Sequence, residues 1–188
     1  MVLAAVIAAL YIVLTITVAP FAYGPVQFRL SEILTILPAL TPAAIPGLAI
    51  GCLLSNILNP AGSLGLVDMI GGTAATLIGA ILTRWIAKRT GLIETSPHPL
   101  GRNEVVRRPA LYLMTLPPIL SNALIVGSYL TFLLFEASER TFSLLLFNMF
   151  SVGLGEVVMA GIGGVLVYLA VAPRMQQIYR RNIRTIKA

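Results

Sequence analysis

Long apolar runs separated by short polar breaks make up most of this chain. A helix needs roughly 20 apolar residues to cross a hydrocarbon core about 30 Å thick. Runs that meet this length predict membrane-spanning helices over about 2–20, 66–88, 110–134 and 142–171.

The apolar segment from 30 to 59 has a different pattern, because a proline recurs in it every four residues. Proline removes a backbone donor and clashes with the preceding helical turn, so one smooth helix is not expected. The pattern predicts a short helix over about 30–40 and a longer one over about 43–58. If both cross the membrane the chain has six spans, and if they form a re-entrant hairpin it has four. The prolines concerned are Pro38, Pro42 and Pro46.

Composition supports a membrane class. The chain has 188 residues, of which 57% are hydrophobic and 11% are charged. Soluble domains carry about 25% charged residues. We therefore predict a single all-α integral membrane domain over 1–188, whose spans leave little chain for anything outside the bilayer.

The basic residues predict how the spans are oriented. They gather in the loop around 89–109 and in the tail after the last span, and short basic loops stay in the cytoplasm. With four spans or with six, this loop and both termini lie on the same side of the membrane, so we expect an N-in, C-in topology. The clustering also explains the net charge of +6 without nucleic acid, and anionic lipid is a secondary partner for the tail.

Several absences exclude other functions. The sequence has no GxxxxGK[ST] motif for an ATPase and no GxSxG motif for a serine hydrolase. His98 is the single histidine and Cys52 the single cysteine, which leaves no metal-ligand cluster and no disulfide. We expect no catalytic residue, no metal and no cofactor.

Glu156 is the polar residue that most needs an explanation. It lies near the centre of the last predicted span, where a charge costs about 2.5–3.5 kcal/mol on insertion scales. Gly153 and Gly155 leave space beside it. We predict that Glu156 binds a ligand or an ion.

Other polar residues fall in the middle or outer half of the predicted spans, and each has an alternative structural role. Asn122 and Asn148 either contact the same ligand or join helices by hydrogen bonds. Asp68 either belongs to the site or caps its helix in water. Asn56 ends the helix before it.

Arg29 and Glu32 stand three residues apart at the start of the broken unit. They either line the mouth of a site or form an exposed pair at a helix start, worth only tenths of a kcal/mol. Small residues spaced four apart on the first span allow close helix contact, either with a partner subunit or within the chain. These are Ala4, Ala5, Ala8 and Ala9.

The sequence resembles the QueT family of queuosine-precursor transporters, which are substrate-binding (S) components of energy-coupling factor (ECF) transporters. The likeness is spread over nearly the whole chain. It is carried by "YGPVQFRLSE" (23–32), "LTPAAIPGLAIGCLLSN" (40–56), "GLVDMIGGTAATLIGA" (65–80), "LPPILSNALIVG" (116–127) and "VGLGE" (152–156).

The resemblance implies a six-helix S-component fold in a bacterial plasma membrane, with the loop after the first span as a lid over the ligand. It also implies a transmembrane coupling subunit that docks on the alanine stripe, and two ATPase subunits that supply the energy. The chain itself would bind the ligand at high affinity and would catalyse no covalent reaction.

The implied ligand is a 7-deazaguanine such as aminomethyl-deazaguanine. A carboxylate can accept its adjacent N–H and amino groups together, the role we expect for Glu156. The remaining ring atoms would be contacted by Asn122, Asn148 or Gln27. The ammonium group would be contacted by Asp68 or Glu32. Arg29 would hold Glu32 or close the lid. The alternatives are an S component for another vitamin and a standalone secondary carrier of a purine-like base.

Overall fold

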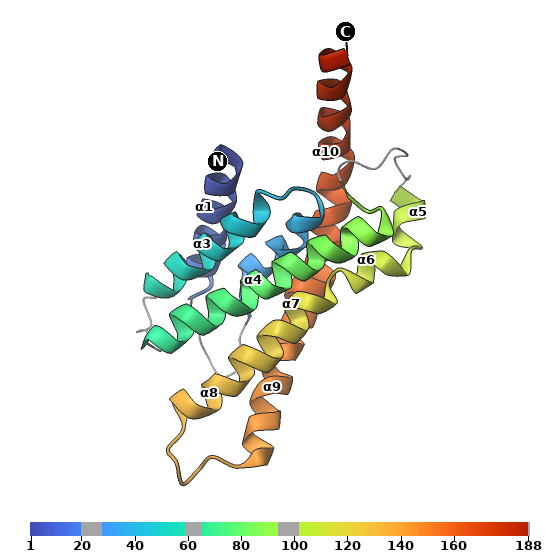
Figure 1. Ribbon diagram of the computed structural model, residues 1–188. Coiled ribbons are helices and arrows are strands. Elements are labelled where there is room, and N and C mark those ends of the chain that lie inside the picture. Colours follow the sequence, from blue (N-terminus) through green and yellow to red (C-terminus); the bar gives the residue numbers. More distant parts are fainter. Residues whose placement is uncertain (20–27, 59–64, 94–101, 188) are drawn as a thin grey trace.

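The computed structural model describes residues 1–19, 28–58, 65–93 and 102–187 (Figure 1). Every regular element within these ranges is helical, as the apolar pattern predicts. The two chain ends lie at the same end of the molecule (Figure 1).

Three helical segments of the described chain are long and apolar enough to cross a membrane. They cover Leu66–Thr90, Pro109–Leu134 and Phe142–Ile178. The first belongs to α4 (Gly65–Thr90). The second joins α6 (Pro109–Leu113), α7 (Leu116–Ser121), the π-helix η2 (Asn122–Val126) and α8 (Gly127–Leu134). The third joins α9 (Phe142–Glu156), the π-helix η3 (Val157–Gly163) and α10 (Gly164–Lys187).

Shorter apolar helices form the N-terminal part of the bundle. They are α1 (Val2–Thr17), η1 (Leu30–Ala39) and α3 (Ala44–Ile57). The proline-rich unit is broken where the sequence predicts, but its first half is a 3-10 helix with Pro38 inside it. A 3-10 helix rises further per residue than an α-helix, so ten residues of η1 reach deeper into the bundle.

Two predicted helices differ in detail from the structure. The segment predicted over 110–134 breaks near Thr115, because Pro117 and Pro118 open α7 without backbone donors. The last helix extends past the predicted end at 171 and continues through Pro173. The predicted cytoplasmic loop also contains a short helix, α5 (Arg102–Val106).

Side chains are distributed as expected for a protein solvated by lipid. Large apolar residues such as Phe150 (71% exposed) and Ile70 (68% exposed) face outward, whereas Glu32, Asp68 and Glu156 are buried. A soluble domain would show the opposite distribution, with charged side chains exposed and large apolar side chains buried. The described helices therefore form a membrane protein with a polar interior.

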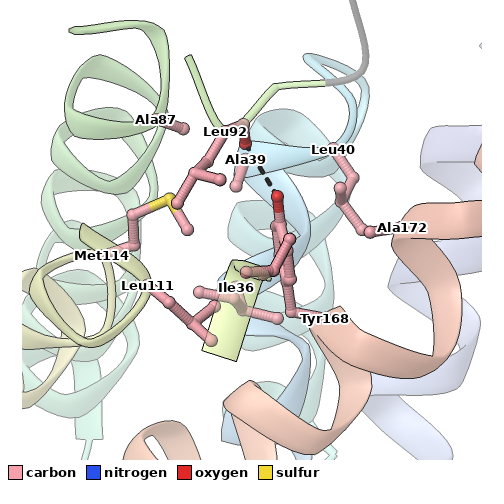
Figure 2. Packing of buried hydrophobic residues seen from close by; sticks show 10 residues of the cluster. Ile36, Ala39, Leu40, Ala87, Leu92, Leu111, Met114, Tyr168 and Ala172 are labelled. Atoms are coloured by element: carbon pink, nitrogen blue, oxygen red, sulfur yellow. Dashed lines mark hydrogen bonds between the residues drawn. The ribbon is translucent and has the colours of Figure 1, made fainter. Parts of the chain in front are cut away.

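An apolar core fills the bundle at the C-terminal end of α4 (Figure 2). Ile36 of η1 and Leu40, which follows the end of η1, meet Leu111, Met114 and Tyr168 there. Tyr168 lies near the start of α10, and its hydroxyl donates to the carbonyl of Leu92 over 3.1 Å. This core fixes the end of η1 between α4 and α10, so the start of η1 points away from the core.

Helix α1 packs closely against α3 through two glycines. A Cβ added to Gly47 would lie 2.8 Å from the carbonyl oxygen of Ala4, and one added to Gly51 would lie 2.7 Å from the Cβ of Tyr11. Real Cβ atoms do not approach so closely, so these glycines set the spacing of the two helices. Ala4 and Ala8 therefore serve packing within the chain on one side of α1.

We expect Gly51→Ala to lower the thermal unfolding temperature, because the new methyl group must push α1 away from α3. Overpacking of this kind costs about 1–3 kcal/mol. Gly161→Ala is the matched control, since its Cβ would find its nearest neighbour at 3.7 Å, an ordinary contact. Equal melting of the two purified variants in detergent would contradict the close packing described.

Candidate functional site

Buried polar side chains from five parts of the chain meet at the end of the bundle opposite the apolar core. On α4, Asp68 in the first turn and Ala87 in the core are separated by 19 residues, about 28 Å at 1.5 Å per residue. The polar cluster consists of Arg29, Glu32, Asn56, Asp68, Asn122 and Glu156, all of them buried.

Arg29 and Asp68 form the ionic centre of this polar cluster. The Arg29 Nη2 atom lies 3.5 Å from Asp68 Oδ1, with the two side chains 5% and 1% exposed. Tyr129 on α8 donates its hydroxyl to the same carboxylate oxygen over 2.5 Å. The Asn56 amide, at the end of α3, donates to the Asp68 carbonyl over 3.0 Å. The segment before η1 is thereby tied to α3, α4 and α8.

Gly72 allows these groups to converge on one face of α4. A Cβ at this position would lie 3.0 Å from the Asn56 amide nitrogen, 3.5 Å from the Tyr129 hydroxyl and 3.6 Å from Arg29 Nη1. Any side chain here would displace the network that surrounds the Arg29–Asp68 pair.

Glu32 lies one turn into η1 and receives hydrogen bonds from two other helices. The Tyr11 hydroxyl on α1 donates to Oε1. The Asn122 amide donates to Oε2 over a longer distance of 3.5 Å. Just beside them, Thr15 on α1 donates to the Ser31 hydroxyl over 2.7 Å. Helix α1 thus fixes the position of the start of η1 through side-chain hydroxyls.

Glu156 ends α9 at the point where the π-helix η3 begins. Its side chain is 6% exposed and has Asn122, Glu32 and Arg29 as its polar neighbours. Asn122 in turn begins the π-helix η2. Single π-helical turns are frequent at functional sites, because the extra residue redirects the side chains next to it. Here both of them flank polar residues that point into the interior.

Asn148 is held at a separate position on the seam between α8 and α9. Its amide donates to the Thr131 hydroxyl over 2.9 Å. The helices meet closely here, since a Cβ on Gly127 would lie 2.5 Å from the Cα of Met149. This contact fits the helix-joining alternative for Asn148.

Several buried acceptor oxygens in this interior lack a donor. Among the described residues, four buried carboxyl or amide oxygens have no hydrogen-bond partner: Asn56 Oδ1, Asp68 Oδ2, Asn148 Oδ1 and Glu156 Oε2. Buried polar atoms are normally satisfied, and each exception calls for an explanation. The polar cluster also places three carboxyl groups beside the single guanidinium of Arg29. Both features suit a partner that brings N–H donors and positive charge.

Two alternatives considered from the sequence are wrong. Asp68 is not a helix cap facing water, because it is 1% exposed and paired with Arg29. Arg29 and Glu32 are not an exposed pair, because both are buried. Sequence spacing suggested that Arg29 would hold Glu32, whereas its ion pair reaches α4 instead. Gln27 lies outside the described residues.

Two tyrosines of the network were not predicted from the sequence. Both lie in apolar spans, yet their hydroxyls donate to Glu32 and Asp68. The available signal was that a tyrosine in mid-span needs a partner for its hydroxyl. Within the described part of the chain, no cluster of three metal-ligating residues occurs.

An open apolar groove of about 610 Å³ runs between α1 and α3 on the surface. Ala5 and Ala9 are exposed in it, while Ala8 is buried against α3. The alanine stripe therefore divides into one side used for internal packing and one side left on the surface. The groove is lined by Met1, Ala4, Ala5, Ala8, Ala9, Ile12, Ala43, Pro46, Ile50 and Leu54.

A helical bundle with an apolar exterior and a buried, acceptor-rich polar cluster defines a polytopic membrane protein of the transporter class. The chain belongs to the QueT transporter family, whose model matches residues 1–173. It is similar to the "Queuosine precursor transporter QueT" of Lactococcus lactis subsp. cremoris (strain MG1363), with 41% identity over 76 residues. That match spans 39% of this chain and 43% of the relative. No solved structure matches the chain.

Proposed function

We propose that this chain is the substrate-capture subunit of an ECF-type importer and binds a queuosine precursor, a 7-deazaguanine such as aminomethyl-deazaguanine. The observation that carries this proposal is the set of buried oxygens without donors, with Glu156 Oε2 and Asp68 Oδ2 among them. A deazaguanine offers an adjacent ring N–H and amino group, and the aminomethyl substituent adds a cation. Membership of the QueT transporter family and the name of the Lactococcus relative support the same ligand class.

Each polar residue has a proposed role in this account. Glu156 accepts the ring N–H and amino group in a bidentate manner. Asn122, between Glu156 and Glu32, contacts the ring carbonyl or a ring nitrogen, with Gln27 as a further candidate. Glu32 faces the ammonium group, because Asp68 is already paired with Arg29. Asn56 and Asn148 support the walls of the site through their bonds to Asp68 and Thr131.

The orientation follows from charge. Lys88 and Arg89 stand at the apolar-core end of α4, and positive residues beside a span mark the cytoplasmic side. The polar cluster at the other end would then face outward, as capture from outside requires. We propose a six-helix arrangement of the single domain 1–188 in a bacterial plasma membrane, with both termini inside and the loop after α1 as a lid.

Calorimetric titration of the purified chain tests the proposed ligand. Aminomethyl-deazaguanine, cyano-deazaguanine, guanine and common vitamins are titrated under the same conditions. Saturable binding of a deazaguanine, with guanine much weaker, is the expected result. Tight binding of an unrelated vitamin with no response to deazaguanines would contradict the proposal and favour the alternative S-component function.

We further propose that the exposed side of the alanine stripe docks a transmembrane coupling subunit, which acts with two ATPases. Ala5 and Ala9 line an open groove that a partner helix can approach closely. Ala5→Phe is expected to block co-purification with the coupling subunit and ATP-dependent uptake, while ligand binding stays intact. Leu10→Phe is the control, since Leu10 is 48% exposed on α1 outside the groove.

Uptake by vesicles that contain this chain and lack any ATPase would contradict the ECF mechanism. It would favour a standalone secondary carrier driven by an ion gradient. The proposal assigns no catalytic step to the chain, in line with its membership of a transporter family.

Tyr11→Phe is expected to weaken deazaguanine binding about fivefold to tenfold while the chain stays folded. The Tyr11 hydroxyl donates to Glu32 and holds its position, and fivefold to tenfold corresponds to about 1–1.4 kcal/mol, part of the roughly 1.5–3 kcal/mol of a hydrogen bond to a charged group. Tyr112→Phe is the matched control, because its hydroxyl donates to the Val106 carbonyl at an exposed position. Equal affinities for the two variants would exclude Tyr11 from positioning Glu32.

A further inference from the structure

A second apolar groove lies on the surface where α4 meets α6 and α7. It has a volume of about 430 Å³. Two close contacts join the helices beside it. A Cβ on Gly79 would lie 2.9 Å from the Cα of Pro118, and the Thr83 hydroxyl donates to the Met114 carbonyl over 2.9 Å. The groove is lined by Ile78, Leu82, Ile86, Leu113, Leu116, Pro117, Leu120, Ser121, Leu124 and Ile125.

The α4 side of this groove continues into a cationic helix end. Leu82, Trp85 and Arg89 follow one another at spacings of three and four, which places them along one stripe of the helix. The Arg89 guanidinium lies over the Trp85 ring, 5.0 Å from its centroid. Trp85 is 54% exposed, and Lys88 and Arg89 are exposed in the last turn of α4. An apolar channel therefore leads to two positive charges beside an aromatic ring.

We propose that this groove and its cationic end bind one anionic phospholipid. The groove is about 12 Å long between Ile78 and Ile86, counted at 1.5 Å per residue, and takes part of one acyl chain. The phosphate and the anionic headgroup meet Arg89 and Lys88. Trp85 lies at the junction between the acyl chain and the headgroup, where an indole ring is well solvated.

The charge of the headgroup determines which phospholipid this groove prefers. A guanidinium fork binds phosphate with two parallel hydrogen bonds. A phosphatidylcholine would bring the same chains and phosphate, but its headgroup is zwitterionic and its trimethylammonium group would face Lys88 and Arg89. The proposal therefore predicts a preference for phosphatidylglycerol over phosphatidylcholine, and it is independent of the ligand bound at the polar cluster.

Trp85 is the single tryptophan of the chain, so its fluorescence reports on this groove directly. The protein is placed in vesicles of unlabelled lipid that contain the same small fraction of either brominated phosphatidylglycerol or brominated phosphatidylcholine. We expect the glycerol lipid to quench Trp85 far more strongly, because each basic residue near the surface enriches anionic lipid roughly fivefold.

Two variants and one control test whether Lys88 and Arg89 cause this lipid preference. Arg89→Gln and Lys88→Gln are each expected to remove most of the excess quenching. Arg102→Gln removes an exposed charge from α5, which lines a different cleft against Tyr168, and is expected to keep it. Equal quenching by the two lipids, as would follow if the groove receives a protein helix instead, overturns the proposal. Loss of the excess in Arg102→Gln, which indicates general surface charge, also overturns it.

Discussion

Replacing Glu156 by Gln is expected to weaken deazaguanine binding by about 100-fold or more, while the chain stays folded. The two hydrogen bonds from the ring N–H and the amino group to a carboxylate are charge-assisted, at about 1.5–3 kcal/mol each. Glutamine has the same shape but presents an NH₂ group where one acceptor oxygen stood, so one bond is lost and one donor opposes another. A loss of about 2.7 kcal/mol corresponds to 100-fold in affinity.

Stability should not fall in this variant, because Glu156 and Glu32 are neighbouring carboxyl groups in a buried region. Glutamine keeps the shape of the side chain and leaves Glu32 beside a neutral group. Glu136→Gln is the control, since Glu136 lies exposed between α8 and α9. Calorimetric titration and thermal unfolding of both variants separate the two effects. Unchanged affinity in Glu156→Gln would remove this residue from the site.

Replacing Arg29 by Met is expected to destabilise the protein by about 3–5 kcal/mol. The substitution leaves the carboxylate of Asp68 buried at 1% exposure without its cation. Thermal unfolding in detergent is the measurement. The double variant Arg29→Met/Asp68→Asn is expected to recover much of the loss, because it removes both charges together.

A matched ion pair at the surface provides the control. Arg108 and Glu104 lie 3.4 Å apart with 42% and 56% of their side chains exposed. Exposed pairs contribute about 0–1 kcal/mol, so Arg108→Met should melt close to the unchanged protein. If Arg29→Met also melts unchanged, or if adding Asp68→Asn brings no recovery, the buried pair does not organise this end of the bundle.

Composition and apolar run length were enough to predict the helical membrane class and most helix positions. Proline spacing predicted the break between η1 and α3, because the missing donor acts locally. The 3-10 form of η1 and the π-helices after Ser121 and Glu156 were not predictable. An apolar run has no polar stripe that would reveal a change in helical period.

For the candidate site, the cost of charge in a bilayer correctly drew attention to Glu156 as a buried group, whereas the sequence left open whether Asp68 and Arg29 face water or the interior. Their partners were harder to predict. Arg29 meets Asp68 only because η1 lies against α4, and sequence spacing favoured Glu32 instead. The hydroxyls of Tyr11 and Tyr129 act across helices, which no local pattern records.

The most direct test is an experimental structure of the chain with aminomethyl-deazaguanine bound. The account predicts density for the ligand among α4, η1 and α9, with its ring N–H and amino group about 3 Å from the two Glu156 oxygens. Its ammonium group should face Glu32. A ligand bound elsewhere, or one that leaves Glu156 without a contact, would contradict the account.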